Sequence, residues 1–148
     1  MGNILAGALF GLMTLAFSSQ LFAQADVIEK RQKLMKSQSA AAKAIKAAVE
    51  SKDHATIEAK AKDIMGTAEQ IPGLFPKGST KGKTKAKNEI WENNAEFVKD
   101  AKALGKAASE LAAAAKARND AEIGVKVKAL GDACTSCHKQ FRAAKYSE

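Results

Sequence analysis

The sequence Cys134-Thr135-Ser136-Cys137-His138 constrains this chain more than any other feature. On a helix its two thiols lie one turn apart, so each can add to a vinyl group of one haem and form a thioether. The next residue, His138, then stands where its imidazole can bind the haem iron. Because these are the only two cysteines among 148 residues, the spacing indicates one covalently attached c-type haem with its iron.

Other chemistries use a similar pair of cysteines. A thioredoxin-type dithiol occurs in an alternating strand–helix pattern, and the sequence contains no convincing strand. A zinc site needs a fourth ligand, and the only other histidine, His54, stands alone among charged and small residues. We therefore favour haem attachment over a redox dithiol, a disulfide or a zinc site, and we expect His54 to be a solvated turn residue.

The first 25 residues are uncharged and mostly apolar, and they end in Ala23-Gln24-Ala25. This pattern predicts a secretory signal peptide over residues 1–25, cleaved after Ala25, and a mature single domain over residues 26–148. The segment before the apolar stretch lacks the usual Lys or Arg, and an uncleaved anchor is the alternative. Since haem is attached covalently on the outer side of the energy-conserving membrane, we expect a periplasmic protein.

Charge and composition narrow the class of partner and the kind of core. The net charge of +8 falls wholly in residues 26–148. Export excludes nucleic acid, so the expected partners are acidic redox proteins or membrane electron-transfer complexes, with at most transient membrane contact. Only 5% of the residues are aromatic while alanine is abundant, and such a small-residue core leaves room that a haem fills.

Apolar residues recur in steps of three and four along four segments, which predicts helices. Asn119 and Glu122 form a plausible capping box at the start of the last segment, whose apolar stripe includes Cys134 and Cys137. Short connections between the first two and the last two segments indicate an all-α, antiparallel up-down-up-down four-helix bundle. The predicted helices cover about 26–50, 53–71, 88–117 and 119 to beyond the cysteines, with a loop from Pro72 to Lys87.

Several short motifs resemble those of the class II c-type cytochromes, the cytochrome c′ family, over the whole of residues 26–148. The attachment site near the C-terminus, continuing through Phe141-Arg142, is similar to the family's C-x-x-C-H-x-x-F/Y-R pattern. Leu74-Phe75-Pro76 and Ile90-Trp91 resemble its L-F-P and I-W signatures. Arg31-Gln32 resembles the R-Q pair near the start of its first helix.

The resemblance implies roles for seven residues. His138 is the expected proximal ligand of the iron, Cys134 and Cys137 the thioether anchors, and Arg142 a neighbour of the proximal face. Arg31 and Gln32 are expected to reach a haem propionate, although ordinary surface solvation is the alternative for both arginines. Met35, four residues after Arg31, stands where low-spin members carry an iron-binding thioether; the alternative is a flexible core filler. Met65 is the only other methionine after residue 25.

These roles predict a low-spin carrier of single electrons, with His138 and Met35 both bound to the iron. The alternative is a high-spin protein that binds or sequesters nitric oxide or carbon monoxide at the sixth position. An enzyme is not expected, because a haem peroxidase needs a distal acid–base pair and only His54 is available. Monomer and homodimer both stay open. We also expect a basic rim at the haem end of the bundle, made of Lys77, Lys81, Lys83, Lys85, Lys87, Lys139, Arg142 and Lys145.

Overall fold

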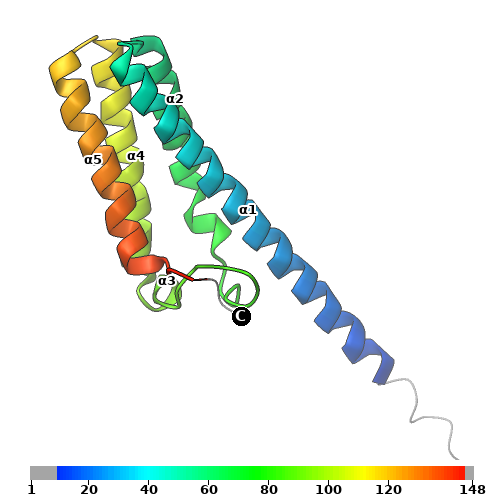
Figure 1. Ribbon diagram of the computed structural model, residues 1–148. Coiled ribbons are helices and arrows are strands. Elements are labelled where there is room, and N and C mark those ends of the chain that lie inside the picture. Colours follow the sequence, from blue (N-terminus) through cyan, green and yellow to red (C-terminus); the bar gives the residue numbers. More distant parts are fainter. Residues whose placement is uncertain (1–9, 146–148) are drawn as a thin grey trace, which may run out of the picture.

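The computed structural model describes residues 10–145, with side chains from residue 25 onward, and this part of the chain is built of helices (Figure 1). Its only β-type pairing is an isolated antiparallel bridge between Ala86 and Arg142. In chain order the elements are α1 (Phe10–Glu50), α2 (His54–Gln70), the short 3-10 helix η1 (Pro72–Leu74), α3 (Glu89–Glu92), α4 (Asn94–Lys116) and α5 (Asp120–Phe141).

Helices α1, α2, α4 and α5 form the predicted antiparallel four-helix bundle, but two helix boundaries were predicted wrongly. The first helix, expected from about residue 26, begins at Phe10. The segment expected to run unbroken from 88 to 117 is interrupted at Asn93, whose backbone leaves the helical region with φ −113° and ψ 46°. The Asn94 side chain donates to the Ile90 carbonyl oxygen at 3.3 Å. Asparagine competes in this way for backbone hydrogen bonds, which explains why the helix breaks here.

Small residues allow α2 and α4 to pack closely in the middle of the bundle. Ala61 and Ala108 are fully buried, and a Cβ placed on Gly105 would lie 3.7 Å from the Cβ of Ala68. Larger buried side chains, Ile57 and Leu111 among them, complete this part of the core. The alanine-rich composition therefore produces close helix packing here.

The two tight turns at one end of the bundle share one geometry. Lys52 and Arg118 both adopt left-handed backbone, with φ 55° and 53°. Each is followed by a capping residue, Asp53 or Asn119, whose side chain accepts from a backbone N–H three residues later. Glu122 is that donor for Asn119, and the Asn119 side-chain amide donates to the Glu122 carboxylate at 3.4 Å. The Asn119 backbone N–H donates instead to the Ala114 carbonyl oxygen, so the predicted N-cap is confirmed, but the second bond of a capping box does not form.

Helix α1 packs against α2 but barely touches α5. Figure 1 shows α1 leaving the bundle at the end where α5 finishes. The predicted cleavage point after Ala25 lies inside α1, and residues 1–9 of the predicted signal peptide lie outside the described residues. Within residues 10–145, no helix has the length and apolarity needed to cross a membrane.

Candidate haem site

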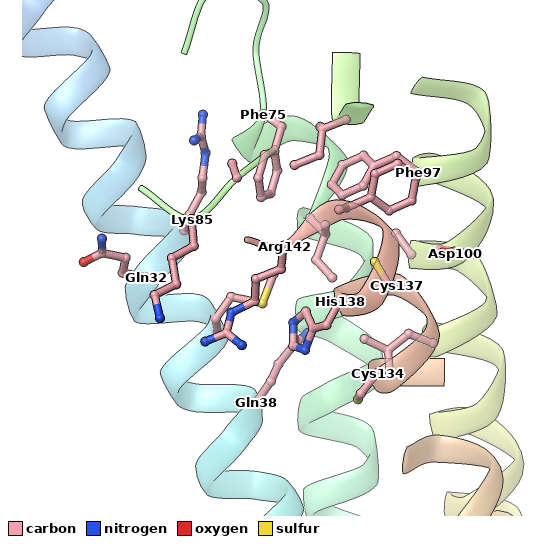
Figure 2. Close-up of a pocket in the computed structure, with 18 of the residues that line it drawn as sticks. Gln32, Gln38, Phe75, Lys85, Phe97, Asp100, Cys134, Cys137, His138 and Arg142 are labelled. Carbon is pink, nitrogen blue, oxygen red and sulfur yellow. The ribbon is translucent and has the colours of Figure 1, made fainter. Parts of the chain in front are cut away.

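A cavity of about 520 Å³ separates α1 from α5 and reaches the connection between α2 and α3 (Figure 2). Because these two helices hardly contact each other, the cavity lies along the side of the bundle where one helix–helix interface is missing. The cavity brings together all seven residues singled out from the sequence, namely Arg31, Gln32, Met35, Cys134, Cys137, His138 and Arg142.

The α5 wall of the cavity carries both thiols in a partly buried setting. Burial raises the pKa of Cys134. Burial, with smaller effects from the Asp100 carboxylate and Cys134, raises the pKa of Cys137 to about 11. Redox-active cysteine pairs depend instead on a lowered thiol pKa. These neutral thiols therefore argue against a thioredoxin-type site and suit addition to a vinyl group.

His138 follows on the same helix and is suited to bind iron as a neutral ligand. The residue is solvent-exposed as a whole, but the protein around its ring and then the positive charge of Arg142 lower its pKa. A lowered pKa keeps the imidazole uncharged at neutral pH, so a ring nitrogen is free to bind a metal. Figure 2 shows the His138 ring projecting into the cavity from α5.

His54, the other histidine, takes no part in this site. It begins α2 at the opposite end of the bundle, where its Nε2 lies 2.6 Å from Asp120 Oδ1. No group of three or more His, Cys, Asp or Glu side chains within the described residues is placed to hold a metal ion by itself. Both findings weigh against the zinc alternative.

The α1 wall contains Arg31, whose buried guanidinium is bound by the loop after η1. It donates to the carbonyl oxygens of Leu74 and Ser79, at 3.1 Å for the latter, and to the Ser79 hydroxyl. Its Cζ lies 4.4 Å from the ring centre of Phe75. Burial lowers the pKa of Arg31 to about 10, so the group stays charged at neutral pH. Arg31 thus fixes the loop over one end of the cavity.

Gln32 and Met35 lie on the same wall as Arg31. Gln32 donates to the carbonyl oxygen of Lys83 at 2.9 Å, which ties α1 to the loop a second time. Met35 is partly buried and packs against the core. One turn further along α1, Gln38 donates to the Thr67 hydroxyl of α2 at 3.1 Å.

Sequence reasoning missed three kinds of cavity residue. Gln38 was detectable, because it follows Met35 by three positions and so shares its helix face. Phe75 and Phe97 stack edge to face, with ring centres 4.9 Å apart, and close the upper part of the cavity in Figure 2. Asp100 lies beside Cys137. No pattern in the sequence distinguishes it from the surface carboxylates of α4.

The residues that line the cavity fit a covalently attached haem. Two neutral thiols one turn apart are available for thioethers, and an uncharged imidazole is available for the iron. The space between α1 and α5 supplies a slot with aromatic and aliphatic walls. Cys134, Cys137 and His138 would hold the group from one side, and the α1 wall would cover the other.

Comparisons with known proteins agree with this site. The family model described as "Cytochrome C'" matches residues 26–142. The chain is 36% identical to cytochrome c′ of Pararhodospirillum photometricum over 78% of its own length and 94% of that protein. The crystal structure of cytochrome c′ from Thermochromatium tepidum superposes with a TM-score of 0.75 at 30% identity, covering 81% of this chain and 96% of that one. A second cytochrome c′ structure, of a protein with "an unusual ligand-controlled dimer dissociation", superposes with a TM-score of 0.76 at 29% identity. The match covers 81% of this chain and 96% of that one.

These matches correct the expected chemistry of the iron. The prediction of a low-spin electron carrier with both His138 and Met35 on the iron is wrong, because proteins of the matched family are typically high-spin and bind small ligands. The R-Q spacing placed Met35 on the correct wall, but a helix register cannot decide whether a thioether reaches a metal, and flexible packing is the commoner fate of a helical methionine. The attachment motif, the cavity between α1 and α5 and the matched relatives together show that the chain belongs to the cytochrome c′ family, whose members carry one covalent haem c and are periplasmic in bacteria.

Proposed function

We propose that this protein binds nitric oxide or carbon monoxide at the sixth position of a high-spin haem, on the side opposite His138. The observation that carries the proposal is the position of the two histidines. His138 lines the cavity, whereas His54 lies at the far end of the bundle. The α1 wall therefore offers no second imidazole to the iron. The match to cytochrome c′ weighs against its other donor, the Met35 thioether, so we assign the sixth position to a ligand from solution.

Each residue around the cavity then has its own role in binding. Cys134 and Cys137 anchor the haem, and the neutral imidazole of His138 supplies the fifth ligand. Burial of the His138 ring first, and then the positive charge of Arg142, lower the pKa of His138 and favour the uncharged ring. On the other side, Met35 restricts the space in which a gas can bind. When bound, the haem supplies a ferrous iron that takes up the gas.

Absorption spectra of the purified holoprotein test this function directly. We expect a broad high-spin pattern in the reduced protein and a clear spectral change when carbon monoxide is added. A sharp low-spin pattern that carbon monoxide leaves unchanged would overturn the proposal. The absence of any haem spectrum would overturn the site itself.

Substitutions of Met35 test how the α1 wall limits binding. Met35→Leu conserves the apolar volume, so its spectrum and gas affinity should match those of the wild type. Met35→Ala opens space beside the sixth position, and we expect about a tenfold higher carbon monoxide affinity, equal to about 1.4 kcal/mol. Equal affinities for Met35→Ala and the wild type would show that Met35 does not limit access to the iron.

We further propose that the basic rim guides an acidic electron donor, since carbon monoxide binds only the reduced iron. The loop reaches the end of α5 through two backbone hydrogen bonds, Lys87 N to Phe141 O at 3.0 Å and Ala143 N to Lys85 O at 2.8 Å. These bonds support a rim gathered at the haem end of the bundle. Reduction by an acidic donor should slow as ionic strength rises. A rate independent of salt would count against this partner class.

Export and assembly complete the proposal. Cleavage after Ala25 would leave a mature domain of residues 26–148, and the intact mass of the periplasmic protein checks this.

Since a similar cytochrome c′ shows ligand-controlled dimer dissociation, we propose a homodimer whose dissociation responds to the bound gas. Sedimentation of the reduced protein with and without carbon monoxide tests it, and identical profiles would argue against coupling.

A further inference from the structure

Asp100 of α4 is a cavity carboxylate that the proposed gas chemistry does not use. It lines the cavity, and its Oδ2 is buried without a hydrogen-bond partner among the described residues. Figure 2 shows Asp100 beside Cys137, one of the two haem anchors. After burial, the negative charge of Asp100 contributes to the raised pKa of the Cys137 thiol.

An oxygen in this position is costly, because a buried acceptor without a partner loses its hydration and gains nothing in return. Burial raises the pKa of Asp100, with a further contribution from Glu96. The positive charge of Lys99 opposes this rise only in part. Lys99 Nζ is directed to Glu96, with contacts of 3.0 and 3.3 Å to its two carboxylate oxygens.

A thioether at Cys137 would be uncharged, so it would supply no cation to pair with Asp100. The negative charge of Asp100 would then act on the haem from a partly desolvated position, where an electrostatic interaction is weakened less than in water. The iron gains one positive charge when it goes from ferrous to ferric. A fixed negative charge nearby stabilises the ferric form by more than the ferrous form.

We propose that Asp100 sets the redox equilibrium of the haem, with its partly buried carboxylate lowering the reduction potential. The reaction is the transfer of one electron from an external one-electron donor to the ferric iron, and no bond of Asp100 is made or broken. Asp100 acts through its field on the iron. It controls how much of the protein is in the reduced form, which the proposed binding of carbon monoxide requires.

Redox titration of the holoprotein at pH 7, followed by its absorption spectrum, tests this role. Asp100→Asn keeps the shape of the side chain and removes its charge. At the ambient potential that half-reduces the wild type, we expect about a tenfold rise in the ferrous-to-ferric ratio of Asp100→Asn, which corresponds to 59 mV for a one-electron couple. Glu96→Gln is the matched control. It removes the same charge one turn away on α4 from a more exposed carboxylate that already contacts Lys99, so its ratio should change less.

A ratio for Asp100→Asn equal to that of the wild type or of Glu96→Gln overturns the proposal. Asp100→Leu tests whether the shift in the ratio comes from the lost charge or from a change in structure. It should shift the ratio in the same direction while the ferric spectrum stays unchanged, and a shift in the opposite direction also overturns the role. The measurement needs the haem but no gas. Failure to bind carbon monoxide would therefore sink the proposed function and leave this inference standing.

Discussion

At the scale of single residues, the charged side chain of Arg31 shows how polar contacts replace the water lost on burial. Arg31 is buried, yet its guanidinium meets two backbone carbonyls, the Ser79 hydroxyl and an aromatic face. Each of these partners replaces part of its lost hydration. The same contacts supply donors to the carbonyl of Leu74, the last residue of η1, and to the carbonyl of Ser79 in the loop after it. Arg31 therefore stabilises the loop from η1 to α3 and with it one edge of the haem site.

Arg31→Met tests that role. Methionine retains much of the apolar stem but leaves the Leu74 and Ser79 carbonyls without their donor. We expect the free energy of unfolding to fall by about 2–3 kcal/mol, because hydrogen bonds from a charged donor are lost. Denaturant titration of the holoprotein measures it. Lys30→Met, which removes an exposed partner of Asp26, should cost less than about 1 kcal/mol. Equal losses in both variants would contradict a clamping role for Arg31.

At the scale of the elements, the two tight turns place non-glycine residues in left-handed backbone. A side chain there is strained, and glycine relieves that strain. Arg118→Gly should therefore raise the free energy of unfolding by about 0.5–1 kcal/mol, whereas Arg118→Ala should leave it nearly unchanged. Thermal unfolding of both variants measures the difference in stability. A loss of stability in Arg118→Gly would mean that the arginine side chain contributes more than its backbone conformation costs.

A second element-scale prediction concerns Asp120, which links the start of α5 to the turn between α1 and α2. Hydrogen bonds from His54 first, and then Lys52, lower its pKa. A lowered carboxyl pKa stabilises the fold above the unfolded value of about 4 and stops doing so as the pH falls through the folded value. Asp120→Asn should therefore be less stable than the wild type at pH 7, and the difference should vanish in acid. A difference that persists at pH 2 would contradict this linkage.

The sequence predicts a feature best when the residues that form it lie close together along the chain. Helices and caps follow from neighbours three or four residues apart, so the bundle and the Asn119 cap were predictable, while the break at Asn93 was missed. All seven site residues reach one cavity, because the motif and the helix register place them there. The carbonyl partners of Arg31 lie more than 40 positions away, and the orphaned oxygen of Asp100 depends on packing. Such features appear only in three dimensions.

At the scale of the whole molecule, the haem is part of the core. Helices α2 and α4 pack on each other through small buried residues, but α1 and α5 are separated by the cavity. Without haem, the apolar side chains that line this space of about 520 Å³ would face water instead of a packed partner, and their burial would no longer stabilise the fold. The chain without haem is therefore expected to lose part of its tertiary structure.

The double variant Cys134→Ala, Cys137→Ala removes both anchors and tests this expectation. Hydrogen exchange should become fast along α5 and along the part of α1 around Met35, where the haem would supply the missing contacts. Exchange in the α2–α4 interface, around Ala68 and Leu111, should stay slower, because that packing does not involve the cavity. The single variant Cys134→Ala keeps one anchor and His138, so it should protect α1 more than the double variant does. Protection in the double variant equal to that of the holoprotein would show that the four helices hold together by their own contacts and that the haem does not stabilise the bundle.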